Sequence, residues 1–342
     1  MFNAKDGRPA VFPGDTRAGA ARACRRVQNS LERMALMDPE IVSVLFRQIV
    51  IMFVLMFIGA GLFKTGKISK EGTRSLGNIL IYIVFPAVVV KAFLREFTME
   101  RLTGFLIACA ASLAALILSM LVSALIFRKR PIENFCASFS NAGFIGIPIV
   151  SVVFGDEAVF YVSSFAALLT ILQWTYGVFV ITKDKKQIAV KKVVTNPVVL
   201  SLAVGLILFL TPVEMPPVVS STVNYLADLN APLAMFSVGA YLAQLKAKEI
   251  FCDGAAWLST AVRLILIPLL TVGLLFAVPK DQSLIRTAVL LIAATPAGVN
   301  AAVFAQVFDR DYKQAVKSIC LSTICCIATL PLIISLAQWL WQ

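Results

Sequence analysis

The chain carries, at residues 138–150, the stretch Ser-Phe-Ser-Asn-Ala-Gly-Phe-Ile-Gly-Ile-Pro-Ile-Val, midway through an apolar segment long enough to cross a bilayer. An Asn, two Gly and a Pro fall between Asn141 and Pro148. Gly and Pro weaken or break a helix, and each backbone group that they free needs another hydrogen-bond partner. In hydrocarbon, such irregular backbone is stable only where it packs inside protein or lines a wet cavity. The stretch therefore predicts a broken membrane helix.

A second interruption lies late in the chain, inside another apolar segment, with the sequence Thr295-Pro296-Ala297-Gly298-Val299-Asn300. It again combines Pro, Gly and Asn. Two broken spans in corresponding halves of a membrane chain are typical of the midplane binding site of a secondary transporter. This hypothesis requires that the rest of the sequence divide into two halves with one break in each.

The composition places the chain in a lipid bilayer. Of its 342 residues, 59% are hydrophobic and 15% are charged, and the mean hydropathy is +0.86. A soluble domain is about half apolar and a quarter charged, so we expect an all-α polytopic membrane protein. The basic residues behind the net charge of +12 fall in short loops between apolar spans. Membrane topology explains such loops, and we expect no nucleic-acid partner.

Several kinds of chemistry are absent from the sequence. It contains no His, and its seven Cys lack the spacing of a metal or redox motif. The absence of His excludes imidazole proton relays, imidazole metal sites and Ser-His catalysis. There is also no Walker-type phosphate loop, so ATP does not drive this chain directly. We expect no cofactor, no metal and no enzymatic activity.

We predict ten membrane spans, five in each half of the chain. The first repeat occupies residues 41–182, a Lys-rich loop occupies 183–196, and the second repeat occupies 197–342. The expected spans are at about 44–63, 76–94, 103–127, 135–154, 158–181, 197–211, 222–245, 256–278, 285–307 and 315–340.

The first 40 residues differ from everything that follows. Residues 1–38 hold seven basic side chains, several Gly and Pro, and no apolar run, so they lack the core of a signal peptide. Two interpretations stay open: a disordered tail, or a mis-assigned start with the functional chain beginning near Met34 or Met37. An organelle-type presequence fits less well because acidic residues interrupt it.

Basic residues also decide the expected orientation. Loops after odd-numbered spans carry seventeen Lys and Arg, and loops after even-numbered spans carry five. The positive-inside rule therefore places the odd-numbered loops in the cytoplasm and both termini outside. Arg47 and the basic tail oppose this assignment.

Five spans per half put the two halves in opposite orientations, as an inverted repeat requires. One internal match supports this relation: Pro86 follows Asn78 by eight residues, and Pro232 follows Asn224 by eight residues. Each Asn is also followed two residues later by a Leu. Because Pro kinks membrane helices for many reasons, two unrelated kinks are the alternative.

These motifs resemble those of the auxin efflux carrier family, which includes plant PIN-type carriers and bacterial malonate/malate-type permeases. Residues 141–148, Asn-Ala-Gly-Phe-Ile-Gly-Ile-Pro, are similar to the family's N-x-G-x-x-G-x-P signature. Residues 296–300, Pro-Ala-Gly-Val-Asn, are similar to its ninth-span motif. The resemblance covers about residues 41–342, and the short central loop is similar to that of bacterial members.

The resemblance implies ten helices in two inverted five-helix repeats, akin to bile-acid/sodium symporters. Spans 1, 2, 6 and 7 would form a scaffold that also makes a homodimer. Spans 3–5 and 8–10 would form a transport domain, in which broken spans 4 and 9 cross at the substrate site. A bacterial inner (plasma) membrane is the expected location. An acidic residue that the plant carriers have after span 2 has no clear counterpart here.

The resemblance also implies a small organic anion as substrate, with H⁺ or Na⁺ as a candidate coupling ion. Asn141 would bind the carboxylate, and Gln173 is similar to a substrate-contacting Gln of span 5. The expected substrate-binding residues are Asn141, Gly143, Gly146, Pro148, Gln173, Pro296, Gly298 and Asn300.

The residues themselves point to an anion. Essentially no Asp or Glu lies deep in the predicted spans, whereas a cation pump normally has a buried carboxylate. A broken helix frees backbone N–H groups at the positive end of its second half, and these favour an anion. An Asn amide adds a neutral donor. Freed carbonyls at the other half-helix would suit Na⁺, although the sequence does not require it.

Each candidate also has a structural alternative. Gly143 and Gly146 would serve close helix packing, and Asn141 or Asn300 would form hydrogen bonds that hold neighbouring helices together. Pro148 and Pro296 would be plain helix kinks. Arg263 is the one charge well inside an apolar span. It would snorkel to the cytoplasmic surface, pair structurally, or attract anions.

The resulting prediction is a secondary active transporter of small organic anions such as mono- or dicarboxylates, working by alternating access. The alternatives are an anion-conducting channel and a Na⁺-coupled symporter of bile-acid-like anions on the same fold. An integral-membrane enzyme is a weaker rival, because the sequence offers no His and no buried carboxylate.

Overall fold

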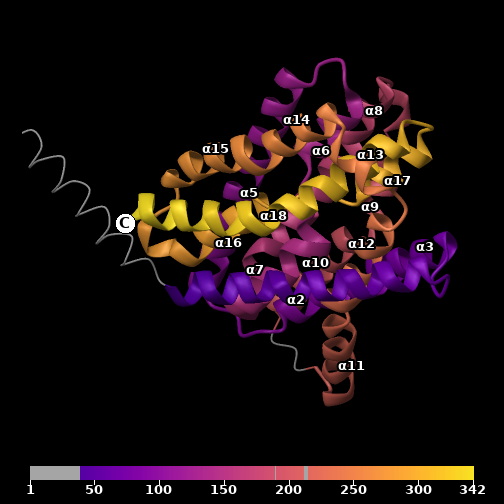
Figure 1. Ribbon diagram of the computed structural model, residues 1–342. Helices are drawn as coiled ribbons and strands as arrows, with labels where there is room; N and C mark the ends of the chain where they lie inside the picture. The colour runs from indigo at the N-terminus through magenta and orange to yellow at the C-terminus, as the bar shows by residue number, and fades with distance from the viewer. Residues whose placement is uncertain (1–38, 189, 212–214) are drawn as a thin grey trace, which may run out of the picture.

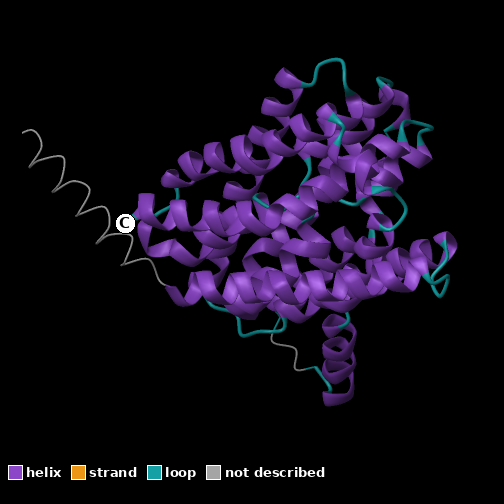
Figure 2. Cartoon of the chain, in the orientation of Figure 1, coloured by secondary structure: helices purple, strands orange, loops and turns teal. Residues whose placement is uncertain are grey.

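The computed structural model describes residues 39–188, 190–211 and 215–342, which form an almost entirely helical chain (Figures 1 and 2). Seven helical segments of the described chain are long and apolar enough to cross a membrane. The predicted polytopic membrane class is therefore confirmed. The ten-helix inverted repeat stays a prediction, and the expected tail at 1–38 lies outside the described residues.

The first half begins with two long spans and one interrupted span. Helix α2 covers Pro39–Lys64, and α5 covers Met99–Ile126. Between them, α3 (Lys70–Ile79) passes through a π-helical turn, Leu80–Val84, into α4 (Phe85–Phe93). A π-helical turn inserts an extra residue into the helix and is frequent at functional sites.

The fourth expected span is broken where the sequence predicts it. Helix α6 (Pro131–Ser138) ends before Asn141, and the chain resumes as a π-helical turn, Ala142–Gly146, that continues into α7 (Ile147–Leu172). Helix α7 bends at Gly155, which has φ +78° and ψ 180°. Only glycine adopts this backbone region without strain, so Gly155 permits the turn between the fourth and fifth expected spans.

The remaining helices run to the C-terminus in shorter pieces. After a π-helical turn (Gln173–Gly177), they are α8 (Val178–Thr182), α9 (Val190–Val194), α10 (Pro197–Leu210), α11 (Pro217–Asp228), α12 (Asn230–Leu242), α13 (Ala247–Phe251), α14 (Gly254–Ala261), a π-helical turn (Val262–Leu266), α15 (Ile267–Leu274), α16 (Ser283–Ala293), α17 (Asn300–Val307) and α18 (Tyr312–Trp341). Three short 3₁₀ turns join them at Lys185–Gln187, Leu275–Ala277 and Lys280–Gln282.

The expected span at 222–245 is not one helix. It consists of α11 and α12, which meet at Leu229, and α11 projects from the body of the molecule in Figure 1. Pro232, in the first turn of α12, cannot donate a backbone hydrogen bond, which explains why the helix does not continue through this point. The matching Pro86 is the second residue of α4, which directly follows the π-helical turn of the second span. Each copy of the Asn–Pro motif thus lies at an interruption.

Two packing features position the site. Helices α2 and α12 cross at Gly239, where a Cβ atom would overlap the carbonyl of Met56, so their backbones touch. Helix α16 is buried almost throughout, with Leu290, Leu291 and Ile292 fully shielded. The end of α16 is therefore fixed inside the molecule.

Arg286 is one of the five basic residues counted above for the loops after even-numbered spans, but it lies in a helix rather than in a loop. It is 4% exposed in α16, donates a hydrogen bond to the carbonyl of Val278, and lies 5.3 Å from the ring centre of Trp341. Helix α16 begins at Ser283, two residues before the expected span at 285–307, so Arg286 lies in its first turn.

Candidate functional site

The two interrupted stretches meet at the centre of the molecule. Ser140 and Ala297 form an antiparallel β-bridge, in which Asn141 N donates to Pro296 O at 2.7 Å and Gly298 N donates to Phe139 O at 3.0 Å. Breaking a helix in hydrocarbon leaves backbone groups without partners. Here each break supplies hydrogen-bond partners for backbone groups of the other, so the two breaks form one structural unit.

The carbonyl ends of the two half-helices converge on Arg263. Its guanidinium donates to Ala137 O at 3.0 Å and Ser138 O at 3.4 Å, at the end of α6. It also donates to Ala293 O and, at 3.1 Å, to Thr295 O, at the end of α16. A helix C-terminus carries partial negative charge, so the guanidinium neutralises both ends.

Arg263 is 2% exposed, so it does not snorkel to the surface. No carboxylate pairs with it within the described part of the chain; its partners are carbonyls and the hydroxyl of Ser119, 3.2 Å away. Of the expected roles, the observed contacts match the structural one.

The half-helices that follow the two breaks begin at a cavity of about 850 Å³, which their N-terminal ends face. Asn141 precedes the first, and its side-chain oxygen accepts from Phe144 N at 3.2 Å as a helix cap. Asn300 is the first residue of the second, α17. The N-terminal end of a helix carries partial positive charge. This holds for α17 although the N–H groups of Ala301 and Ala302 donate to the carbonyls of Gly298 and Val299. The two broken spans, which we call the crossing, comprise α6 and α7 in the first half and α16 and α17 in the second. The positive N-terminal ends of α17 and of the turn before α7 face the cavity, and the negative C-terminal ends of α6 and α16 face Arg263.

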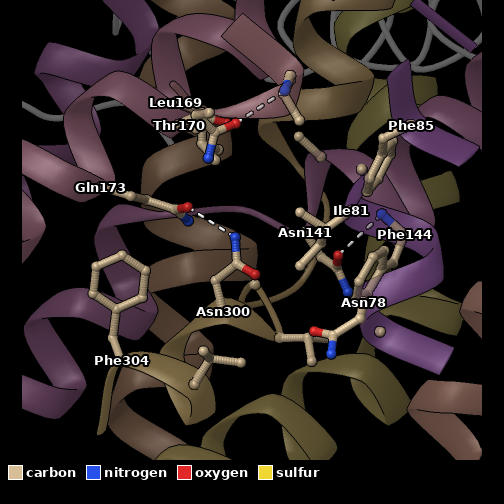
Figure 3. A pocket seen from close by; sticks show the side chains of 18 of the residues that line it. Asn78, Ile81, Phe85, Asn141, Phe144, Leu169, Thr170, Gln173, Asn300 and Phe304 are labelled. Carbon is tan, nitrogen blue, oxygen red and sulfur yellow. Dashed lines mark hydrogen bonds between the residues drawn. The ribbon is translucent and has the colours of Figure 1, made fainter. Parts of the chain in front are cut away.

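Side-chain amides gather where the breaks border the cavity (Figure 3). Asn300 Nδ2 donates to Gln173 Oε1 at 2.9 Å. The remaining nitrogens, Asn141 Nδ2 and Gln173 Nε2, are buried and have no hydrogen-bond partner among the described residues. Leaving a buried donor unpaired costs about 1–3 kcal/mol. Two such donors beside a cavity indicate a ligand with acceptor atoms.

Aromatic rings form two walls of the same cavity. Phe85 and Phe144 stack with ring centres 5.5 Å apart and planes 6° apart. Trp174 and Phe304 lie 4.8 Å apart, centre to centre, on the other side. These walls suit the carbon body of an organic molecule, while the amides suit its polar group.

Five of the eight expected substrate-binding residues line this cavity: Asn141, Gly143, Gln173, Gly298 and Asn300. The other three lie beside it. A Cβ atom on Gly146 would lie 2.8 Å from Ile292, Pro148 is in the first turn of α7, and the carbonyl of Pro296 accepts from Asn141. These three residues therefore stabilise the packing of the two broken spans and do not border the space where a ligand would lie.

Other lining residues were not identified from the sequence. Asn78 was noticed only for its spacing to Pro86, yet its amide points towards the cavity close to Asn141 (Figure 3). Phe85 and Trp174 read in the sequence as ordinary apolar residues of a span. Helical spacing in the sequence could have pointed to Asn78: Lys70, Arg74 and Asn78 are four residues apart and share one face of α3.

Gly143 is expected to tolerate no side chain. A Cβ atom there would overlap the ring of Phe85, which packs directly on the glycine. We expect Gly143→Ala to lower the melting temperature and, because overpacking a core costs about 1–3 kcal/mol, to reduce the yield of folded protein. Thermal unfolding in detergent measures the effect.

The matched rescue is Gly143→Ala combined with Phe85→Leu, since the smaller side chain vacates the space of the ring. Gly77→Ala is the control, because no atom lies within 4 Å of a Cβ there. A Gly143→Ala protein as stable as the wild type would contradict the close packing described above.

Comparison with known proteins agrees with the geometry. The family described as membrane transport protein matches residues 44–334. An uncharacterized transporter of Methanothermobacter thermautotrophicus is 25% identical over 293 residues, which cover 82% of this chain and 94% of that protein. A Rhizobium meliloti protein named "Putative malonate transporter" is 23% identical over 296 residues, covering 81% of this chain and 91% of that one.

A shorter similarity reaches the plant carriers. Auxin efflux carrier component 3a of Oryza sativa subsp. japonica is 32% identical over 124 residues, which are 35% of this chain and 20% of that protein. The family and these relatives are transporters rather than enzymes. The resemblance inferred from the two motifs is confirmed, and the chain belongs to the membrane transport protein family, which includes the auxin efflux carriers.

Proposed function

We propose that the protein is a secondary active transporter of small organic anions such as mono- or dicarboxylates. The observation that carries this proposal is the pair of buried, unpartnered amide donors, Asn141 Nδ2 and Gln173 Nε2, beside the N-terminal ends of two crossed half-helices. Amide donors and helix N-termini bind a carboxylate without a buried Lys or Arg. The name of the Rhizobium meliloti relative supports a carboxylate.

The charges around the cavity agree with an anionic substrate. Within the described parts of the chain, its charged lining residues are Lys70, Glu71 and Arg74, all near the start of α3. The deep part, around Asn141, is lined by amides, the hydroxyl residues Ser140 and Thr170, backbone and apolar side chains. A site for a free cation would normally contain a carboxylate there.

A Na⁺-coupled mechanism receives no support from the crossing. The carbonyls at the ends of α6 and α16, which would suit Na⁺, accept hydrogen bonds from Arg263. We propose that this fixed positive charge takes the place of a cation, so that transport does not need Na⁺ at this position.

The wider architecture follows the family resemblance. We propose ten spans in two inverted repeats, with spans 1, 2, 6 and 7 as a dimeric scaffold and the others as the moving domain. The protein would lie in a bacterial inner membrane with both termini outside. In that orientation, the end of the cavity near Lys70 and Arg74 opens to the cytoplasm.

An ion-pair cluster lies at the end that this orientation places outside. Lys91 Nζ lies 3.4 Å from Asp228 Oδ1 and 3.8 Å from Asp156 Oδ2, so it joins α4 to both α11 and α7. In the proposed division, α4 and α11 belong to the scaffold and α7 to the moving domain. The cluster therefore links the two parts while the cavity is open at the other end.

Removing the lysine is expected to favour the outward-open state. Exposed ion pairs contribute about 0–1 kcal/mol, so Lys91→Met should shift the population by a few-fold at most. The measurement is the labelling rate, from outside, of a cysteine introduced at Val303 on the cavity wall. Lys280→Met is the control, because Lys280 is also at the predicted outer end and has no ion pair among the described residues. Equal labelling in all three proteins would contradict this linking role.

Counterflow in proteoliposomes tests the proposed function. Vesicles loaded with unlabelled malonate should take up radiolabelled malonate transiently above equilibrium, with saturable kinetics and equal rates in Na⁺ and K⁺ buffers. Lactate, pyruvate, malate and indole-acetate serve as competitors. Non-saturating flux without counterflow would favour the channel, and flux abolished by removing Na⁺ would favour the symporter.

A further inference from the structure

The start of α3 provides a second set of anion-attracting side chains, separate from the crossing. Lys70, Arg74 and Asn78 occur at intervals of four residues and all line the cavity. Residues four apart lie one above the other on a helix, about 6 Å apart along its axis. The three side chains therefore form a row about 12 Å long, from the opening of the cavity to the neighbourhood of Asn141.

The charges of this row are not neutralised by acidic neighbours. No ion pair within 4.0 Å involves Lys70 or Arg74 in the described chain, whose three ion pairs all lie elsewhere. Glu71 is the one acidic residue that lines the cavity. Its carboxylate interacts mainly with its own backbone N–H and the hydroxyl of Ser69, at the N-terminus of α3, and more weakly with the charge of Lys70. The acid is thus held chiefly by the helix end, so it offsets only part of the charge of Lys70 and none of the ion pairs involves Arg74.

The surroundings of the row are polar and uncharged. Tyr241, Gln244, Gln306 and Tyr312 line the same end of the cavity, and Tyr312 donates a hydrogen bond to Gln244 at 2.9 Å. An opening bordered by low-dielectric protein focuses the field of the charges at its edge and raises the local concentration of ions of opposite sign. A carboxylate at Arg74 would still be partly hydrated, so it would not be trapped there.

We propose that Lys70, Arg74 and Asn78 form a vestibule site, which binds the carboxylate of an organic anion before it reaches the amides at Asn141. The vestibule site rests on the proposed function, because it presumes an anionic substrate. Lys70 and Arg74 attract the anion, and Asn78 replaces part of its hydration as it moves inwards. The site acts on capture and release at the predicted cytoplasmic side, whereas the crossing determines tight binding.

The alternative is that these cations only fix membrane orientation, as basic residues in cytoplasmic loops do. A matched pair of variants separates the two roles. Lys70→Gln/Arg74→Gln removes two charges from the cavity lining. Lys64→Gln/Lys67→Gln removes two exposed charges at the same end, from residues that do not line the cavity.

The first measurement does not depend on transport. A cysteine at Val303, on the opposite wall, is reacted with an anionic and a cationic methanethiosulfonate reagent, and the ratio of the two rates is recorded. Cys24, Cys109, Cys252 and Cys325 are replaced by Ser, while the buried Cys136, Cys320 and Cys326 remain. We expect the anionic-to-cationic ratio to fall about tenfold in Lys70→Gln/Arg74→Gln and to stay unchanged in Lys64→Gln/Lys67→Gln.

The second measurement is malonate counterflow with all native cysteines present. In Lys70→Gln/Arg74→Gln, the KM for malonate on the cytoplasmic side should rise about tenfold with kcat within twofold, and the dependence of kcat/KM on salt should weaken. Equal rate ratios and equal KM values in the two double variants would overturn the vestibule site and leave the transport proposal standing. A tenfold fall in the rate ratio without counterflow of any tested anion would support the vestibule site and overturn the transport proposal.

Discussion

Replacing Asn141 by alanine is expected to abolish stabilisation of the protein by carboxylates while the protein still folds. The change removes the unpartnered Nδ2 donor, which is the group of Asn141 available to a ligand. A hydrogen bond to a charged group contributes about 1.5–3 kcal/mol, so binding should weaken at least about tenfold. It also removes the cap on Phe144 N, at a cost of about 1 kcal/mol to stability. A thermal-shift titration with malonate measures both effects.

Asn141→Asp is the control that separates the cap from the donor. An aspartate still accepts from Phe144 N, so the helix end and the fold should be retained. It replaces the amide donor by a negative charge, which repels a carboxylate. We expect Asn141→Asp to melt near the wild-type temperature and to bind no carboxylate. Malonate binding of wild-type strength in Asn141→Ala would remove Asn141 from the site.

Replacing Arg263 by methionine is expected to have the largest effect on folding. Methionine fills a similar apolar volume but leaves the carbonyls of Ala293 and Thr295 without their donor, and that of Ala137 with only a long hydrogen bond, 3.4 Å, from the hydroxyl of Ser119. A buried acceptor without a donor costs about 1–3 kcal/mol, and several together approach the 5–15 kcal/mol that stabilises a typical protein. We expect little monodisperse protein after detergent extraction, or a melting temperature lower by about 10 °C or more. Size-exclusion chromatography with fluorescence detection provides the measurement.

Arg263→Lys should recover part of the loss, because an ammonium supplies three donors where a guanidinium supplies five. Arg101→Met is the matched control: Arg101, in the first turn of α5, is only half-buried, and its guanidinium donates to the carbonyl of Glu96 just before that helix. If Arg263→Met and Arg101→Met proteins were equally stable, the carbonyl ends of α6 and α16 would not depend on Arg263.

The two breaks were predictable from the sequence because their cause is local. Pro cannot donate a backbone hydrogen bond, and Gly lowers helix stability wherever it lies, so the interruptions near Asn141 and Pro296 follow from composition alone. Their convergence was predictable only through the family resemblance. The bridge between Ser140 and Ala297 joins residues 157 positions apart, and no local rule specifies such a contact.

The role of Arg263 could not be predicted from the sequence. Its depth in an apolar span made snorkelling one of three open roles, because a lone arginine gains most by reaching water. The partners that keep it buried come from α6 and from the segment after α16, so their positions depend on the folded chain. Asn78 was missed for the same reason: its spacing to Pro86 is visible in the sequence, but the cavity beside it is not.

The β-bridge between Ser140 and Ala297 makes the site depend on both halves of the chain. One side of it comes from the first half of the chain and the other from the second half, and Gln173 of the first half accepts a hydrogen bond from Asn300 of the second. Neither half therefore contains a complete binding site. A gene cut within the loop at 183–196 would encode two inactive fragments, and activity would return only by complementation, when both are made in one membrane.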